Sequence, residues 1–163
     1  LVSAFQLVLK RHPDAQLTIA GSAPQIDIPN CQIVGEKNLD ELIPLYHNAD
    51  IFCMPTLLEP FGIVFLEAMA AKLPVVATNL GALPDFIQNG WNGWLVSPHD
   101  VNGIADALSK LLDHPDQCHI YGERSNEIVH TKYNWHAVGK RIEEHVVNYM
   151  NTDPTKNNVH KYG

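Results

Sequence analysis

Short apolar segments alternate with longer amphipathic segments along most of the chain. The short segments are rich in β-branched and aromatic residues, which is typical of buried parallel strands. On this pattern we predict strands at Leu17–Ala20, Gln32–Val34, Asp50–Met54, Val75–Thr78 and Gly93–Val96.

The longer segments repeat their apolar residues at the helical period. We predict helices at Val2–Lys10, Leu39–His47, Phe61–Ala71, Val101–Leu112, from Pro115 onward, and from about Trp135 to Tyr149. In the second of these, Leu39, Leu42, Ile43 and Tyr46 share one predicted apolar face.

Strands that alternate with helices indicate βαβ units and a parallel sheet. The expected fold class is α/β, a doubly wound Rossmann-like domain over residues 1–150, followed by a polar tail at 151–163. In such sheets ligands bind at the carboxyl ends of the strands. We therefore look for the site in the loops that follow the predicted strands.

Charge and composition narrow the possible partners. The chain has 163 residues and a formal charge of −7, which argues against binding nucleic acid or an anionic membrane surface. No apolar run approaches the roughly 20 residues of a membrane span. The cysteines are widely spaced, which favours free thiols and a cytoplasmic location. The histidines share no ligand spacing, so we predict no metal.

One segment, Leu58–Met69, carries the clearest signal for chemistry. It turns from loop into helix at about Phe61 or Gly62, where Pro60 suits a helix entry and Gly62 leaves room for a ligand. The first amides of a helix have no internal partners and lie at the positive end of its dipole. This helix end is therefore a predicted diphosphate site.

Two carboxylates frame the predicted anion site. Glu59 precedes the helix, and Glu67 lies about two turns inside it. A nucleotide sugar has this order of groups, because its hydroxyl-bearing sugar and ribose flank a diphosphate, and a carboxylate accepts strong hydrogen bonds from a diol. On spacing alone, however, two glutamates eight residues apart are better explained as ordinary surface residues, because such pairs occur by chance in most proteins of this size.

The surrounding sequence resembles the signature of glycosyltransferase family 4, the retaining GT-B transferases with an E-x7-E motif. The resemblance covers nearly the whole chain. The matching segments are Glu59–Val64, Glu67–Ala70, Pro74–Thr78, Gly81, Asp85 and Gly93–Val96.

The resemblance implies a role for each candidate residue. Glu59 would contact hydroxyls of the donor sugar as the catalytic-site carboxylate. The amides of Phe61 and Gly62 would meet the sugar, and those of Ile63 and Val64 the diphosphate. Glu67 would bind the ribose. The donor would be a UDP-, GDP- or ADP-sugar, with no cofactor, and the transferred group a hexosyl unit.

The resemblance also implies a loop for the base and a second domain. Gly35 and Glu36 would hold the base through the backbone. The chain starts at Leu1 inside a predicted helix, so we expect an N-terminally truncated donor domain. The acceptor-binding domain and the basic residues that grip the phosphates would lie upstream, and the chain alone would be inactive.

Two departures from the family pattern are visible. Lys72 stands where the family usually has glycine, and Ala82 replaces the second glycine of a Gly-Gly pair. Neither removes a predicted charged contact. A lysine at a helix end is explained by the dipole, so we do not assign Lys72 to phosphate.

Two other functions remain open from the sequence. A nucleotide-sugar epimerase can share this two-domain fold. A non-catalytic nucleotide-sugar-binding or interaction module could keep the fold without transfer. The Glu59–Gly62 segment joined to Glu67 at this spacing favours the transferase.

Overall fold

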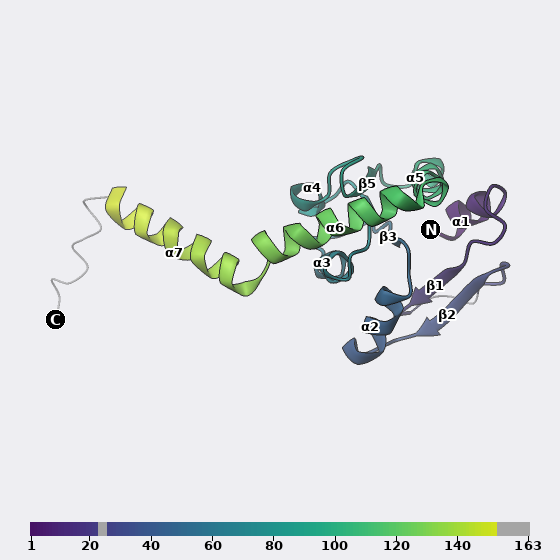
Figure 1. Cartoon of the computed structure of the whole chain (residues 1–163), viewed down its shortest axis with the longest axis horizontal. Helices are drawn as coiled ribbons and strands as arrows, with labels where there is room; N and C mark the ends of the chain where they lie inside the picture. Colours follow the sequence, from purple (N-terminus) through teal and green to yellow (C-terminus); the bar gives the residue numbers. More distant parts are fainter. Residues whose placement is uncertain (23–25, 153–163) are drawn as a thin grey trace.

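The computed structural model describes residues 1–22 and 26–152 and has alternating strands and helices in these ranges (Figure 1). The strands are β1 (Leu17–Ala20), β2 (Cys31–Gly35), β3 (Phe52–Met54), β4 (Val75–Thr78) and β5 (Gly93–Val96). The helices are α1 (Val2–Leu9), α2 (Leu39–His47), α3 (Ile63–Ala70), α4 (Leu83–Phe86), α5 (Val101–Asp113), α6 (Pro115–Lys132) and α7 (Trp135–Thr152). The predicted strands are confirmed, and the short α4 is an element that the hydrophobic pattern did not reveal.

All the strand pairs are parallel, as predicted. The hydrogen bonds of the described strands form two sheets, one of β1 and β2 and one in the order β3-β4-β5. The expectation of one continuous sheet is therefore not met at the level of hydrogen bonding. Both sheets still have the parallel strands of the predicted α/β class, and in the three-stranded sheet the helices α3 and α4 intervene between consecutive strands.

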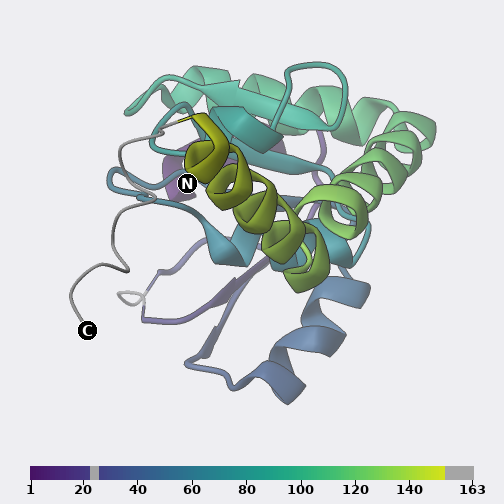
Figure 2. The same ribbon diagram turned by 90° about the vertical axis from the view of Figure 1, so that its left-hand side faces the viewer.

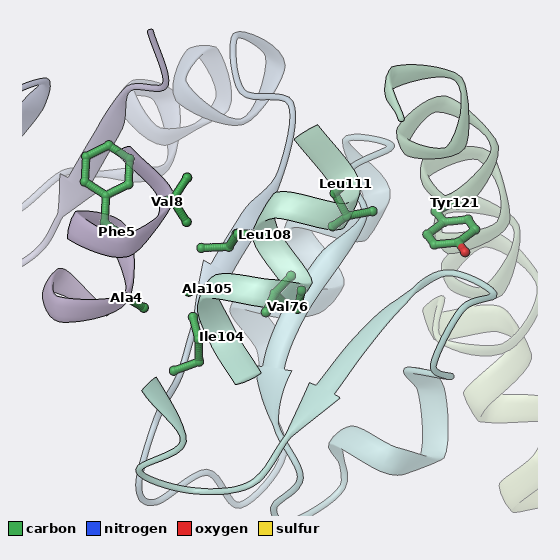
Figure 3. Packing of buried hydrophobic residues seen from close by; sticks show 10 residues of the cluster. Ala4, Phe5, Val8, Val76, Ile104, Ala105, Leu108, Leu111 and Tyr121 are labelled. Carbon is green, nitrogen blue, oxygen red and sulfur yellow. The ribbon is translucent and has the colours of Figure 1, made fainter. Parts of the chain in front are cut away.

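β4 is the centre of the three-stranded sheet, and each of its residues is buried. Val76 faces one apolar cluster, which is formed largely by α1 and α5 (Figure 3). Val75 and Ala77 face the other cluster, formed by α3, α4 and α6. This alternation follows from the two-residue period of a strand. Helices on both faces of β4 make the domain doubly wound.

The two sheets occupy different sides of the molecule. Figures 1 and 2 both place α2 with the β1–β2 pair, apart from the helices that pack on β3-β4-β5. Figure 1 also shows α7 running away from both sheets toward the C-terminal end. α7 continues to Thr152, and positions 153–163, which make up most of the predicted polar tail, lie outside the described residues. Among the described helices, none combines the length and apolar character that a membrane span requires.

α2 differs from the prediction in how it is buried. Leu39 is 58% exposed and Ile43 is 42% exposed, and none of the nine described residues of this helix is fully buried. Leu39 and Ile43 of its predicted apolar face are therefore exposed, whereas Tyr46 of the same face packs against the cluster of α3, α4 and α6. The helix is also stabilised at its start by a capping box, in which Asn38 and Glu41 exchange side-chain and backbone hydrogen bonds.

Lys72 lies in a backbone conformation that favours glycine. It follows the C-cap of α3 with a φ of 63°, the left-handed conformation common just after a helix. Its ammonium group pairs with Glu123 of α6 at 2.8 Å, and this contact holds the pKa of Glu123 below its usual range. The side chain therefore has a structural partner, which agrees with our not assigning it to phosphate.

We expect Lys72→Gly to raise the free energy of unfolding by about 1 kcal/mol, because glycine adopts the left-handed conformation without the steric cost of a Cβ atom. The lost ion pair is exposed and contributes little. Lys72→Ala is the matched control, since it removes the same ion pair and keeps the strain. Chemical denaturation of both variants measures the difference. A free energy of unfolding for Lys72→Gly that is no higher than that for Lys72→Ala would contradict the expectation.

Candidate functional site

The N-terminus of α3 carries the backbone amides that the sequence predicts as an anion site. The helix begins at Ile63 with Gly62 as its N-cap, slightly later than predicted. The N–H groups of Gly62, Ile63 and Val64 make no hydrogen bond with any residue in the described ranges. Ile63 is 65% exposed, so the end of the helix is open to solvent. Unpaired donors at the positive end of a helix favour an anion at this place.

Gly62 has a structural role at the entry to α3. Its φ is 93°, a left-handed conformation. A Cβ atom here would lie 2.6 Å from Leu83 and 2.9 Å from Phe65. The space beside Gly62 is therefore filled by the protein's own side chains rather than kept for a ligand. The glycine lets the chain turn into α3 while packing against the core.

Glu59 lies in the loop between β3 and α3 and is held there by its own backbone and by a neighbouring loop. Its Oε1 atom accepts a hydrogen bond from the N–H of Phe61 at 3.3 Å. A Cβ atom on Gly81 would lie 1.8 Å from the carbonyl oxygen of Glu59. The loop after β4 therefore contacts the Glu59 loop so closely that only glycine fits. The amide of Phe61, which the resemblance directs toward the sugar, is already bound to the Glu59 carboxylate.

A hydrogen bond at the carboxyl ends of β3 and β4 holds the first part of the same loop. The hydroxyl of Thr78, which is 1% exposed, donates to the carbonyl oxygen of Thr56 at 2.6 Å. The hydroxyl of Thr56 in turn donates to the carbonyl oxygen of Leu58 at 2.8 Å. These bonds fix the loop just before Glu59.

The ring of Phe61 packs against two other aromatic rings, although the residue remains 44% exposed. It lies 6.3 Å from the ring of Phe86 and 6.4 Å from the ring of Tyr133, centroid to centroid. These aromatic contacts give the entry to α3 a second anchor beside Gly62.

Glu67 lies on α3 and receives a hydrogen bond from α2. The hydroxyl of Tyr46 donates to its Oε2 atom at 3.1 Å. Burial, followed by the negative charge of Glu67, raises the pKa of Tyr46 above its usual range. Tyr46 therefore remains a hydrogen-bond donor to this carboxylate at any physiological pH.

The predicted base loop follows β2. Gly35 ends that strand with a φ of 74°, and its carbonyl oxygen accepts from the N–H of Gly21 at 2.8 Å. Glu36 is exposed. In the part of the chain that the structure describes, no hydrogen bond joins either predicted residue to Glu59 or Glu67. Their link to the rest of the site is α2, which follows them and contacts Glu67 through Tyr46.

Sequence reasoning missed the residues that position the two carboxylates. Tyr46 was expected only on an apolar helix face, and Thr56 and Thr78 had no predicted function. Gly81 was noted only as part of the family resemblance. No local pattern reveals these roles, because each depends on a partner that is distant along the chain.

Two tryptophan rings lie beneath cations of the protein itself. Arg124 lies over the ring of Trp91, and Lys110 lies over the ring of Trp94. Within residues 1–22 and 26–152, no group of three or more histidine, cysteine, aspartate or glutamate side chains is placed to hold a metal ion.

A family model described as glycosyl transferases group 1 matches residues 1–128. The chain belongs to this family. The match covers the loops and helices that carry Glu59, Glu67, Tyr46 and Gly81. The family resemblance inferred from the Glu59–Val64 and Glu67–Ala70 segments is therefore confirmed at the level of the group 1 transferases.

Two curated relatives are similar to the chain over most of its length. The glycogen synthase of Mycobacterium tuberculosis is 32% identical in an alignment that covers 84% of this chain and 36% of that protein. A GDP-mannose-dependent phosphatidylinositol monomannoside mannosyltransferase of the same species is 31% identical in an alignment that covers 88% of this chain and 42% of that protein. The chain therefore spans less than half the length of either relative.

A solved structure gives the corresponding comparison of folds. The C-terminal domain of a glycosyl transferase group 1 family protein from Francisella tularensis is 28% identical, with a TM-score of 0.74. The match covers 82% of this chain and 77% of that domain. The chain thus has the fold of one half of a GT-B glycosyltransferase, and these matches do not favour the epimerase or the non-catalytic module.

Proposed function

We propose that this chain is the nucleotide-sugar-binding domain of a retaining glycosyltransferase. The whole enzyme would transfer a hexosyl group from a UDP-, GDP- or ADP-sugar to an acceptor. The acceptor-binding domain would be supplied by another part of a longer protein, so the chain by itself would bind donor and transfer nothing. The free thiols of all three cysteines support the prediction of a cytoplasmic enzyme.

One observation carries this proposal. The unpaired amides at the start of α3 follow Glu59 and precede Glu67 along the chain, and each of these two carboxylates is held by a specific hydrogen bond. A diphosphate at these amides would place a hexose toward Glu59 and a ribose toward Glu67. The name of the mannosyltransferase relative gives GDP-mannose as its donor, and such a donor has this order of groups.

The proposed chemistry uses the helix end to stabilise the leaving group. The bond between the sugar carbon and the diphosphate oxygen breaks, and the diphosphate leaves with the electron pair. The acceptor oxygen forms the new bond on the same face of the sugar and transfers its proton to the departing diphosphate oxygen. Amides of Ile63 and Val64 would stabilise the charge that develops on the diphosphate, while Glu59 would orient the sugar hydroxyls.

Titration of the ¹⁵N-labelled chain tests the proposal. We expect UDP, GDP or ADP to shift the amide signals of Gly35, Glu36 and Gly62–Val64, and the best ligand to identify the base. Glu67→Ala should weaken binding of that nucleoside diphosphate about tenfold, because a hydrogen bond to a charged group contributes roughly 1.5–3 kcal/mol.

Glu143→Ala is the matched control, since Glu143 lies on α7, away from the proposed site. It should leave the affinity unchanged. If the ligand shifted the amide signals of α3 equally in Glu67→Ala and in the unaltered chain, a ribose contact at Glu67 would be excluded. If millimolar ligand shifted no amide at the start of α3, either in this chain or in the longer protein, the proposal would be wrong.

A further inference from the structure

Glu67 and Tyr46 form a side-chain contact between two helices that are far apart in the sequence. The hydroxyl of Tyr46 on α2 lies 3.1 Å from Oε2 of Glu67 on α3. Both side chains are half-buried. The bond fixes one oxygen of the carboxylate and leaves Oε1 without a hydrogen bond to any residue of the described ranges.

The ring of Tyr46 is itself held in place by aromatic neighbours. It lies 5.9 Å from the ring of Phe52 on β3, measured between centroids. Phe52 in turn packs edge-on against Phe65 of α3 at 5.3 Å. An aromatic series therefore runs from α2 through β3 to α3, and it limits the movement of the Tyr46 hydroxyl.

A glutamate on a helix surface has several accessible rotamers, and ordering it on binding costs conformational entropy. The Tyr46 contact removes part of that freedom before a ligand arrives. It also leaves Oε1 as the available acceptor for an incoming diol. Since α2 directly follows the predicted base loop, the same contact connects the base and ribose parts of the site.

We propose that Tyr46 is a positioning residue that holds the Glu67 carboxylate in place to accept the ribose hydroxyls of the donor. This inference rests on the proposed function and adds to it a residue outside the E-x7-E segment. Tyr46 acts through Glu67 and does not itself touch the nucleotide.

The test compares two ligands and two protein variants by isothermal titration calorimetry. The ligands are the nucleoside diphosphate selected in the titration above and its 2′,3′-dideoxy analogue. Tyr46→Phe keeps the ring and its contacts and removes only the hydroxyl. We expect Tyr46→Phe to bind the normal diphosphate about fivefold more weakly and the dideoxy analogue with unchanged affinity.

The control variant is Tyr121→Phe on α6. Tyr121 is 8% exposed and belongs to the α1–α5 core cluster, so loss of its hydroxyl should change neither affinity. Circular dichroism and thermal melting of both variants would establish that the fold is intact.

The outcomes separate this inference from the proposed function. An equal loss of affinity for both ligands in Tyr46→Phe would make Tyr46 a structural residue and overturn the inference. Unchanged affinity of Tyr46→Phe for both ligands would also overturn the inference, while the proposed function would stand. If the unaltered chain failed to distinguish the two ligands, Glu67 would not hold the ribose hydroxyls, and both the ribose assignment and the inference would fall.

Discussion

Gly81→Ala should displace the Glu59 loop and abolish measurable binding of the donor nucleotide sugar. A Cβ atom at this position would lie 1.8 Å from the carbonyl oxygen of Glu59 and 3.1 Å from that of Pro60. Both contacts are with backbone, which cannot rotate away as a side chain can. The φ of 54° adds a steric cost for any side chain. We expect a loss of unfolding free energy of about 3 kcal/mol, at the upper end of typical substitutions.

The matched control for this prediction is Gly90→Ala. Gly90 also has a positive φ, 72°, but the contacts of a Cβ atom there would be at ordinary distances of 3.8 Å or more. The Gly90→Ala variant should therefore lose only about 1 kcal/mol of unfolding free energy, which is the cost of a side chain in the left-handed conformation. It should keep its affinity for the donor. Denaturation and ligand titration of the pair are the measurements. Equal affinities in the two variants would show that the Gly81 contact does not position the Glu59 loop.

Gly122→Ala should separate α6 from α3 and destabilise the domain by about 3 kcal/mol. Gly122 is buried in α6, and a Cβ atom on it would lie 2.0 Å from the carbonyl oxygen of Lys72, just after α3. To make room, the two segments must move apart, which opens the packing around Phe65 and Met69. In isolated helices the same substitution is stabilising, so the expected loss comes from tertiary contact alone.

Gly139→Ala makes this argument testable within the same chain. Gly139 lies in α7, and a Cβ atom there would meet no atom within 4 Å. By helix propensity this change should be neutral or stabilising by up to about 1 kcal/mol. In urea denaturation, the changes in unfolding free energy for Gly122→Ala and Gly139→Ala should therefore have opposite signs or very different magnitudes, although both substitutions lie in helices. Similar losses in both variants would contradict the predicted close approach at Gly122.

The hydrophobic pattern predicted much of the fold for a simple physical reason. Val75–Ala77 is apolar at every position because β4 is covered on both faces, and such a strand can be recognised without knowing its neighbours. The α5 segment shows its buried stripe through Ile104, Leu108 and Leu111 in the same way. The short α4 has too few residues to show a period, so the pattern could not reveal it.

The order of residues along the chain was enough to predict the charged groups of the site. The packing that holds them in place could be seen only in the structure. Glu59, the helix entry and Glu67 are close in sequence, so a loop-to-helix transition was enough to bring the carboxylates and the amides together. By contrast, Gly62 proved to pack against Leu83, a contact that no local pattern contains. The roles assigned to the charged residues remain proposals that the titrations will test.

The sequence by itself determined the order and type of most elements, the family, and the short segment that carries both carboxylates. These properties depend on periodicity and on neighbours within one or two helical turns. Only the tertiary structure decided that Tyr46 meets Glu67, that Gly81 supports Glu59, and that Leu39 and Ile43 of α2 stay exposed. Such contacts join residues that are far apart along the chain, and they arise from the packing of whole helices and loops, which no local spacing specifies.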